Sequence, residues 1–331
     1  MTLPDITILA LGGTIASAPS SAGKPARMEL DAESILLAVP EAGQLASIKP
    51  ETFRQTGSAD LAFLDIVELA ARIRAEVESG AKGVVVTQGT DTLEETAFLL
   101  DRLLWVDIPV VMTGAMRHSG KTGEDGPANL LAALQVAACS SAKDCGVVVV
   151  INNEIHLARF VQKAHSTSVS AFTSLPLGPV GYISEDRVQI PLKPCRQHRK
   201  FDLDVNIRVP KVALIPLIFD GSNDVLEHVM NADYEGAVVQ AFGAGHVNSR
   251  HLDALKQIAE AIPTIYCSGP PAGETHVKSC DFQGSELRLI ERGLIPAFGL
   301  KANKARLLLT LMLADRASRE EIAKEYLASS S

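Results

Sequence analysis

The sequence is poor in aromatic residues and has no excess of basic ones. Aromatic residues make up 5% of the chain, and 39 acidic residues against 31 basic ones give a formal net charge of −8. A protein that binds nucleic acid needs a basic surface for the phosphates and commonly stacks bases on aromatic rings. We therefore expect no nucleic-acid partner.

Cysteine is also scarce, and the few cysteines form no pattern. The five residues are Cys139, Cys145, Cys195, Cys267 and Cys280, with no C-x-x-C pair among them. An odd number without paired spacing predicts neither a disulfide framework nor a zinc site. We expect reduced and mostly buried thiols, with no metal and no cofactor.

Long apolar runs are missing as well. No uninterrupted run approaches the roughly 18 residues that a membrane-spanning helix needs. The segment 1–11 carries Asp5 and neither Lys nor Arg, so the basic start of a secretory signal is lacking. Together these observations favour a cytoplasmic protein with no membrane partner.

The chain does have a large apolar content, arranged in short runs. Hydrophobic residues form 47% of its 331 residues, and at roughly 150 residues per domain this length predicts about two domains. Apolar runs near glycines indicate buried parallel strands, and they alternate with segments of helical periodicity. The strands expected first are Ile6–Leu11, Gly83–Gln88, Val110–Thr113 and Val147–Ile151, and the helices are Leu61–Val77, Leu93–Leu104 and Ala128–Ala138.

This alternation predicts an α/β fold of two domains. The larger N-terminal domain, residues 1–190, is expected to hold a mostly parallel sheet flanked by helices. A proline-rich and basic stretch over residues 191–211 predicts a surface linker. Strands and helices alternate again over residues 212–331, which predicts a smaller C-terminal α/β domain. Its expected strands are Val212–Ile218, Ala237–Gln240 and Thr264–Cys267, and its helices are Ser249–Ala261, Lys301–Ala314 and Arg319–Leu327.

Glycine-rich turns follow three of the expected strands. Thr14 comes after Gly12-Gly13, and Thr90 comes after Gly89. Ligands of open parallel sheets bind beyond the carboxyl ends of the strands, where glycines allow sharp turns with exposed N–H groups and hydroxyls. Taken alone, Gly12-Gly13 is also consistent with a simple tight turn, and it fits neither the dinucleotide fingerprint nor the P-loop.

Several segments together are more specific than any one of them. Leu11–Ala16 and Gln88–Ala97 closely resemble the two signature segments of the bacterial-type L-asparaginases. Further similar segments follow in the same order, and they are Gly114–Arg117, Asp125–Leu130, Arg159–Lys163 and Lys304–Arg306. The resemblance covers essentially the whole chain, and it implies hydrolysis of L-asparagine to L-aspartate and ammonia through a threonine acyl-enzyme.

The resemblance also implies a role for each matching residue. Thr14 corresponds to the nucleophile, Thr90 to the second catalytic threonine, and Lys163 to the lysine that pairs with Thr90. Asp91 corresponds to the residue that binds the substrate's α-ammonium group, and Ser58 to the residue that holds its α-carboxylate. Thr14 is our choice for the attacking group, with Thr90, Lys163 and Asp91 as the supporting triad.

The chemistry of an amide suits these roles. A threonine ester divides hydrolysis into two easier steps, but a threonine hydroxyl needs a base to take its proton. A lysine serves as that base only where burial or nearby positive charge favours its neutral form. Charge developing on the amide oxygen needs preorganised donors, and this places Gly57 and Gly89 among the expected substrate-binding residues.

Plainer interpretations exist for the same residues. Those that could simply cap helices are Ser58, Asp60, Thr90, Asp91 and Thr92. Lys163 could be a solvated loop lysine. Only the occurrence of all these groups at expected loop positions favours the catalytic interpretation.

The sequence also departs from the family pattern. Members commonly carry a tyrosine on the loop after the first threonine, whereas Ser17–Leu30 has none and Arg27 or Met28 lies nearest. Ala59 stands where many members have a glutamine, which removes one contact to the substrate's α-amino group and bears on the choice between asparagine and glutamine. His118 stands where proline is common, and we expect it to be a surface histidine.

In this family the neighbouring subunit completes each active site. Ala241–Asn248 resembles the contributing segment, which makes Asn248 the candidate, and Glu286 corresponds to the neighbour's acidic residue. The resemblance thus implies a homo-oligomer, with a dimer as the smallest functional unit and a tetramer as the usual assembly.

The leading expectation is therefore a cytoplasmic L-asparaginase of asparagine catabolism that acts on a small amino-acid amide, with minor L-glutaminase activity. Two alternatives remain open. One is the glutaminase-like component of a tRNA amidotransferase, whose chains usually carry an extra N-terminal domain. The other is a non-catalytic amino-acid-binding protein, which would keep Ser58 and Asp91 without needing Lys163.

Overall fold

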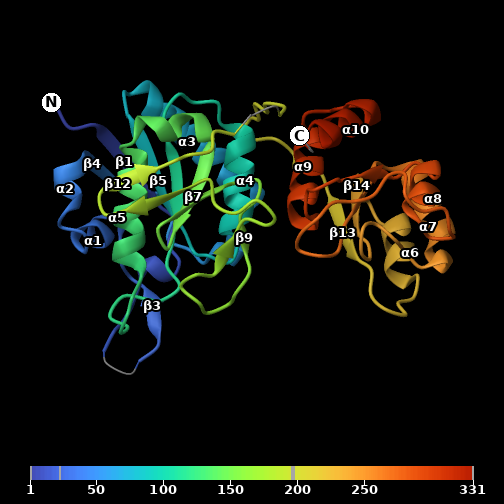
Figure 1. Ribbon diagram of the computed structural model, residues 1–331, viewed down its shortest axis with the longest axis horizontal. Helices are drawn as coiled ribbons and strands as arrows, with labels where there is room; N and C mark the ends of the chain where they lie inside the picture. Colours follow the sequence, from blue (N-terminus) through green and yellow to red (C-terminus); the bar gives the residue numbers. More distant parts are fainter. Residues whose placement is uncertain (1, 22–23, 195–197, 330–331) are drawn as a thin grey trace. The chain divides into compact units, whose positions relative to one another are not determined.

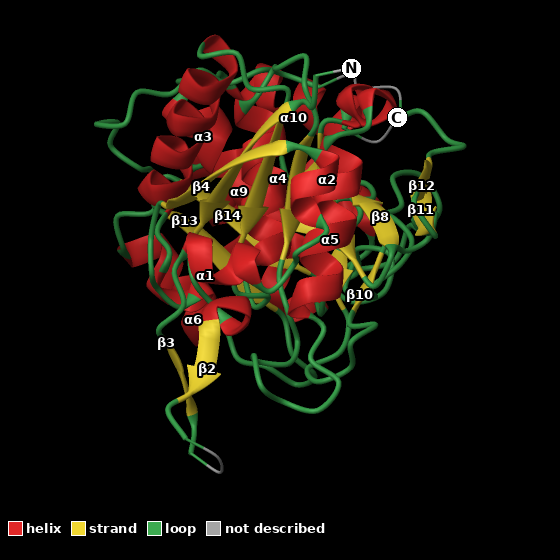
Figure 2. Ribbon diagram, turned by 90° about the vertical axis from the view of Figure 1, so that its left-hand side faces the viewer, coloured by secondary structure: helices red, strands yellow, loops and turns green. Residues whose placement is uncertain are grey.

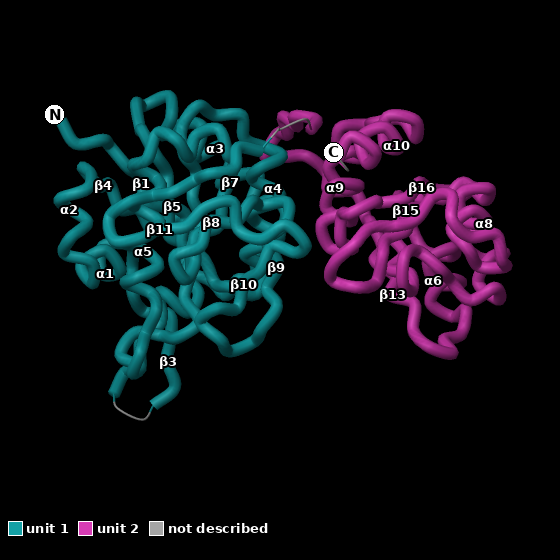
Figure 3. The backbone as a smooth tube through the Cα atoms, viewed as in Figure 1, with its two compact units in different colours: residues 1–196 teal, residues 197–331 magenta. Residues whose placement is uncertain are grey.

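The computed structural model describes residues 2–21, 24–194 and 198–329. The chain forms two compact units, residues 1–196 and residues 197–331 (Figure 3). Cys195 and the adjoining part of the expected linker lie outside the described residues. The other four cysteines are free thiols.

The first unit (Figure 1) is built on an eight-stranded sheet. The order of its strands is β12-β11-β8-β7-β6-β5-β1-β4. The strands from β7 to β4 are parallel, and β8, β11 and β12 extend the sheet in antiparallel pairings. The strands are β1 (Asp5–Ala10), β4 (Ser47–Thr52), β5 (Gly83–Thr87), β6 (Val110–Thr113), β7 (Val147–Ile151), β8 (Glu154–Leu157), β11 (Gly181–Ser184) and β12 (Arg187–Gln189). The expected mostly parallel sheet is confirmed.

Helices cover this sheet. Strands β5, β6 and β7 are buried along their whole length, which explains their uninterrupted valine-rich sequences. Val85, Val111 and Val148 share one core cluster with α5, and α1 and α2 lie on the same side (Figure 2). Helix α4 contacts β6 and β7 and packs against α3. The helices are α1 (Ala32–Leu37), α2 (Ala42–Leu45), α3 (Phe63–Glu78), α4 (Leu93–Leu103) and α5 (Gly126–Ala137).

The start of α3 differs from the expectation. The helix begins at Phe63 with Ala62 as its N-cap residue, and the Asp65 carboxylate accepts a hydrogen bond from the Ala62 N–H at 2.8 Å. Ser58 and Asp60 belong instead to a short 3-10 turn, η2 (Ser58–Asp60). The suggestion that either residue caps α3 is therefore wrong, because Asp65 provides the cap from inside the helix.

Strand β4 was absent from the sequence expectations. It pairs with β1 at the sheet's edge, where a Pro50 without an N–H is tolerated. Its exposed and half-buried side chains include two charged groups, Lys49 and Glu51. Neither composition nor periodicity marks such a segment as a strand.

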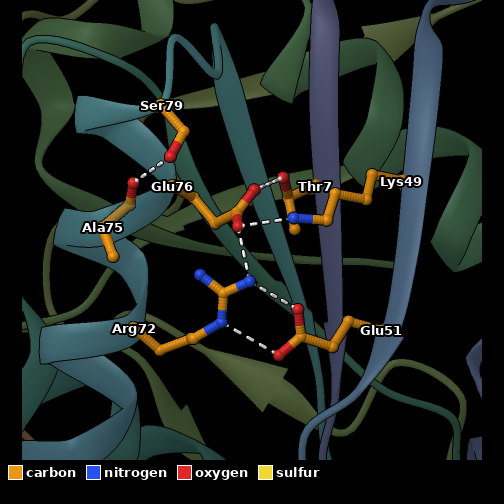
Figure 4. Close-up of polar contacts among 7 residues, drawn as sticks. All are labelled: Thr7, Lys49, Glu51, Arg72, Ala75, Glu76 and Ser79. Atoms are coloured by element: carbon orange, nitrogen blue, oxygen red, sulfur yellow. Dashed lines mark hydrogen bonds and ion pairs between the residues drawn. The ribbon is translucent and has the colours of Figure 1, made fainter.

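Those charged groups join β4 to β1 and α3 through a polar cluster (Figure 4). The Glu76 carboxylate, whose side chain is 5% exposed, accepts hydrogen bonds from Thr7 Oγ1 at 2.6 Å and Lys49 Nζ at 2.7 Å. Arg72 pairs with Glu76 at 2.5 Å and with Glu51 at 2.6 Å. Burial disfavours the charged carboxylate, but the hydrogen bonds outweigh it and lower the pKa of Glu76 to about 2.

The second unit has a smaller, entirely parallel sheet with the order β13-β14-β15-β16. Helix α9 packs against this sheet, where a Cβ on Gly236 would lie 2.8 Å from the Leu309 side chain. A smaller C-terminal α/β domain is thus confirmed. Its main elements are β13 (Val212–Pro216), α6 (Asp224–Asn231), β14 (Gly236–Gln240), α7 (Leu252–Ala261), β15 (Thr264–Cys267), α8 (Glu286–Glu291), β16 (Ile295–Pro296), α9 (Ala302–Ala314) and α10 (Arg319–Ala328). Within the described ranges, no helix combines the length and apolarity needed to cross a membrane.

Candidate active site

The expected site segments follow neighbouring parallel strands and lie together at the carboxyl ends of these strands. Strands β4, β1, β5 and β6 are consecutive in it, and backbone hydrogen bonds continue beyond their carboxyl ends. Leu11 N donates to Thr87 O at 2.9 Å, and Thr56 N donates to Leu11 O at 3.0 Å. Gln88 N donates to Thr113 O at 3.0 Å. The turns after the four strands are therefore neighbours.

Glycines let these turns touch. Gly13 has a φ of +86°, and a Cβ there would lie 2.2 Å from the backbone N and Cα of Gly89. A Cβ on Gly89 would in turn lie 2.9 Å from Ser58 Oγ. Only glycine allows backbones to approach this closely. The turns that carry Thr14, Ser58 and Thr90 consequently form one surface.

Thr90, Asp91 and Lys163 meet on that surface. Lys163 Nζ donates to Thr90 Oγ1 at 2.9 Å and pairs with Asp91 Oδ1 at 2.5 Å. Thr90 is buried, and the Lys163 side chain is 17% exposed, whereas the Asp91 side chain is 72% exposed. Lys163 is not a freely solvated loop lysine: its amine bridges a buried hydroxyl and a carboxylate that faces solvent.

Two contacts hold the backbone of Lys163 in place. It lies in β9 (Gln162–Lys163), where it pairs with Phe172 of β10 (Phe172–Thr173). Its N–H also donates to the carboxylate of Glu94, in the first turn of α4. Sequence reasoning missed Glu94, because an acidic residue in a first helical turn is already explained by the helix dipole.

The threonines before α4 do not serve as simple helix caps. Thr92 occupies the N-cap position, but its side chain makes no capping hydrogen bond. Its hydroxyl donates instead to Ser58 O at 2.8 Å and accepts from Gln88 Nε2 at 3.3 Å. Thr92 therefore ties the buried Ser58, which follows Gly57 in its turn, to the segment that carries Thr90.

Thr14 opens a short 3-10 turn, η1 (Thr14–Ala16), directly after the glycine pair. The following segment folds into the hairpin of β2 (Ser17–Pro19) and β3 (Ala26–Met28). This hairpin returns to the threonine turn, since Gly13 N–H donates to Met28 Sδ at 3.1 Å. Met28 thus contacts the turn that carries Thr14, although, like Arg27, it is exposed to solvent.

A second missed residue, Asp125, orders the turn after β6. Its carboxylate accepts from the N–H groups of Met116 and Arg117 at about 2.8–3.1 Å. Asn129 adds a bond from Nδ2 to Gly114 O at 3.0 Å. The sequence does show an Asp four residues before an Asn at the start of α5. This pattern did not reveal the role of Asp125, because it also fits an ordinary helix N-cap. His118 next to this turn is half-buried.

The remaining predicted residues belong to the second unit. The Asn248 side chain accepts from Arg250 N at 3.1 Å as the N-cap of η4 (Ser249–His251). Glu286 is fully buried, and its carboxylate lies 3.3 Å from His246 Nε2. Within segment 241–248, His246 is thus the residue whose side chain contacts Glu286.

Comparisons with known proteins cover both units of the chain. The family model of the asparaginase N-terminal domain matches residues 5–196, and that of the glutaminase/asparaginase C-terminal domain matches residues 211–325. The chain is 37% identical over 319 residues to a probable periplasmic L-asparaginase of Haemophilus influenzae, covering 94% of this chain and 89% of that protein.

Two further relatives extend the comparison. L-asparaginase 2 of Escherichia coli is 34% identical over 332 residues, with 98% of this chain and 93% of that protein covered. The crystal structure of a probable cytoplasmic L-asparaginase from Campylobacter jejuni superimposes with a TM-score of 0.88 at 32% identity, covering 98% of this chain and 99% of that one.

Proposed function

Because the chain belongs to the bacterial-type L-asparaginase family, we propose that it hydrolyses the side-chain amide of L-asparagine to L-aspartate and ammonia. The observation that carries the proposal is the contact of Lys163 with both Thr90 and Asp91. A relative named glutaminase-asparaginase, from Pseudomonas fluorescens, is 28% identical over 332 residues, which agrees with a minor activity on L-glutamine.

The reaction proceeds in two steps. The Thr14 oxygen bonds to the amide carbon, the carbon–nitrogen bond breaks, and the threonine proton leaves on ammonia. Water then attacks the resulting ester and releases aspartate, which restores the Thr14 hydroxyl. The Thr90–Lys163 pair relays the protons, because the amine lies within hydrogen-bond distance of the Thr90 hydroxyl.

Substrate is held by the turns that meet at the glycine contact. Ser58 receives the α-carboxylate, and Asp91 receives the α-ammonium group. The turns of Gly57 and Gly89 supply N–H groups to the substrate. Ala59 offers no polar side chain next to Ser58, so the substrate's α-amino group has one contact fewer. The site then distinguishes less sharply between asparagine and the longer glutamine.

The test is ammonia release by the purified chain on L-asparagine, D-asparagine and L-glutamine. We expect L-asparagine to be the best substrate, and both Thr14→Ala and Thr90→Val to lose activity by about 100-fold or more. Thr167→Val changes an exposed threonine of the same unit and serves as the control. Binding of L-asparagine without turnover by the unmodified chain would instead identify a non-catalytic amino-acid-binding protein.

We also propose that the active unit is a homo-oligomer, at least a dimer and in its full form a tetramer. In it, the Asn248 and Glu286 region of one subunit serves the site of another. Exposed rings support such a contact: Phe242 and Phe282, on the two segments that meet at His246 and Glu286, are 38% and 49% exposed.

Mixing two inactive variants tests the shared site. Thr14→Ala and Glu286→Gln subunits, dissociated and reassembled together, form mixed dimers with one intact composite site, which restores about a quarter of the activity in a random isologous mixture. Light scattering gives the assembly size. No recovery in mixtures that have demonstrably exchanged subunits would place Glu286 outside its neighbour's site.

A cytoplasmic location is the final part of the proposal. The four described cysteines are free thiols, which suits a reducing compartment. The relatives differ in this respect, since one is named periplasmic and another cytoplasmic. Cell fractionation with compartment markers decides the location.

A further inference from the structure

Three side chains of metal-ligating type meet in the second unit. His246, Cys280 and Glu286 each offer a ligand atom, and these atoms lie within 4.8 Å of one another. They come from separate places: His246 from the loop after β14, Cys280 from the loop after β15, and Glu286 from the start of α8. Their spacing in the sequence, 34 and then 6 residues, follows no metal-binding motif.

The Glu286 carboxylate is hydrogen-bonded through only one of its two oxygens. Its Oε1 accepts from the N–H groups of Ser279 and Cys280, both at 2.7 Å. Its Oε2 is buried and has no hydrogen-bond partner. Leaving a buried carboxylate oxygen unpaired costs free energy, so a positively charged group at this oxygen would stabilise the unit.

His246 presents a second buried atom without a hydrogen-bond partner at the same point. Its Nε2 lies 3.3 Å from Glu286 Oε2. Ligands held at about 2.0 Å from a tetrahedral zinc ion are themselves about 3.3 Å apart. The two atoms therefore already have the separation of neighbouring zinc ligands.

Neighbouring groups contact both side chains or their backbone. The His246 backbone exchanges two 2.8 Å hydrogen bonds with Phe242 in a tight loop, and the Phe282 ring packs edge-on against the imidazole. The two N–H groups on Glu286 Oε1 fix the direction of the carboxylate. Such outer contacts are the usual way in which proteins orient metal ligands.

We propose that His246, Cys280 and Glu286 form a Zn²⁺-binding site, with water as the fourth ligand. Imidazole, thiolate and carboxylate are all zinc ligands. The three ligand atoms lie within 4.8 Å of one another, so a short movement of the thiol brings it to the zinc–sulfur distance of about 2.3 Å. Solvent provides the entry path, because the His246 side chain is 31% exposed and Cys280 is half-buried. Binding replaces the thiol proton by the metal and leaves oxidation states unchanged.

The site also regulates the enzyme, a part of the proposal that rests on the proposed function. A zinc ion on Glu286 occupies the carboxylate that would otherwise serve a neighbouring active site. Zinc is therefore expected to inhibit ammonia release competitively with L-asparagine.

Metal binding is tested without reference to activity. The full chain, freed of metal by a chelator, is titrated with Zn²⁺ by calorimetry and with Co²⁺ by absorption spectroscopy. We expect one ion per chain and a thiolate-to-cobalt charge-transfer band. Cys280→Ser abolishes that band but keeps the backbone N–H that holds Glu286. His246→Ala weakens Zn²⁺ binding at least about 10-fold, because even outer-shell changes cost that much.

Two control variants test whether any loss of metal binding is specific to the proposed ligands. Cys139→Ser changes another half-buried thiol, and His228→Ala changes an exposed histidine of the same unit. Both should bind metal like the unmodified chain. The proposal is overturned by a missing charge-transfer band in the unmodified chain, or by equal Zn²⁺ affinity in the unmodified chain and Cys280→Ser.

Inhibition is measured separately. Zn²⁺ should raise the apparent KM of the unmodified chain and have at least about 10-fold less effect on Cys280→Ser, which keeps the proposed catalytic residues. Equal inhibition of both would overturn the regulatory part even if the spectra show binding. An unmodified chain without asparaginase activity that still gives the charge-transfer band would refute the proposed function and leave the zinc site standing.

Discussion

Gly13 and Gly89 approach so closely that neither turn has room for a side chain between them. The gap of 2.2 Å from a Gly13 Cβ to the Gly89 backbone is far below any van der Waals contact. The turns after β1 and β5 are thus locked together at the point where Thr14 and Thr90 emerge. The relative position of the two threonines depends on this contact.

Gly13→Ala should therefore lower asparaginase activity by about 100-fold or more, since small displacements of reacting groups have effects of that size. The variant should also be less stable, because alanine is strained at a φ of +86°. Ammonia release and thermal unfolding measure both effects. Gly43→Ala is the control: it lies in α2 with nothing within 4 Å of an added Cβ, and it should keep full activity.

Replacing Lys163 should separate chemistry from folding. Lys163→Met removes the amine that contacts Thr90 and should reduce kcat by about 100- to 10,000-fold, the range for loss of a general acid–base group. The unfolding midpoint should change little. Lys193→Met, at a surface lysine whose side chain is 66% exposed, should behave like the unmodified chain. A normal kcat in Lys163→Met would show that another group carries the proton.

Glu76→Gln tests the polar cluster of β1, β4 and α3. The amide cannot replace the charge that faces Lys49 and Arg72, and we expect the N-terminal unit to lose about 2 kcal/mol of unfolding free energy. Urea denaturation followed by circular dichroism provides the value. Glu78→Gln, at an exposed position on the same helix, should leave the midpoint unchanged. Similar midpoints for both variants would argue that Glu76 contributes no net stability.

The buried His156 makes stability depend on pH. Burial lowers its pKa to about 4, from an ordinary value of 6.5. Below pH 6.5 the unfolded chain binds a proton at His156 that the folded chain does not bind. The free energy of unfolding is therefore highest above pH 6.5 and decreases as the pH falls from 6.5 towards 4. Between pH 7 and pH 5 the loss should be about 2 kcal/mol. His156→Gln should show a smaller loss in denaturation curves at the two pH values, and an equal loss would assign the effect to other groups.

The central strands were predictable because each carries its own signal. Val147–Ile151 is buried on both faces, and its unbroken apolar sequence reflects this directly. The resemblance to a family also pointed to Lys163 and Thr90 as partners, although they are 73 residues apart. No local pattern in the sequence indicates that contact.

The features that were missed depend on contacts between distant segments. Strand β4 is polar because Lys49 and Glu51 meet charges on α3, which a local reading cannot show. The contact between His246 and Glu286 was likewise not predicted. Which side chain faces Glu286 depends on the tight Phe242–His246 turn, and this becomes visible only after folding.

The bond from the Gly13 N–H to Met28 Sδ makes the hairpin of β2 and β3 dependent on a thioether. Met28 is 37% exposed, so peroxide can reach the sulfur and convert it to a polar, chiral sulfoxide. The hairpin would then rest against the threonine turn through a bulkier group of different geometry. The hairpin that follows Thr14 is therefore open to an oxidation that methionine sulfoxide reductase can repair.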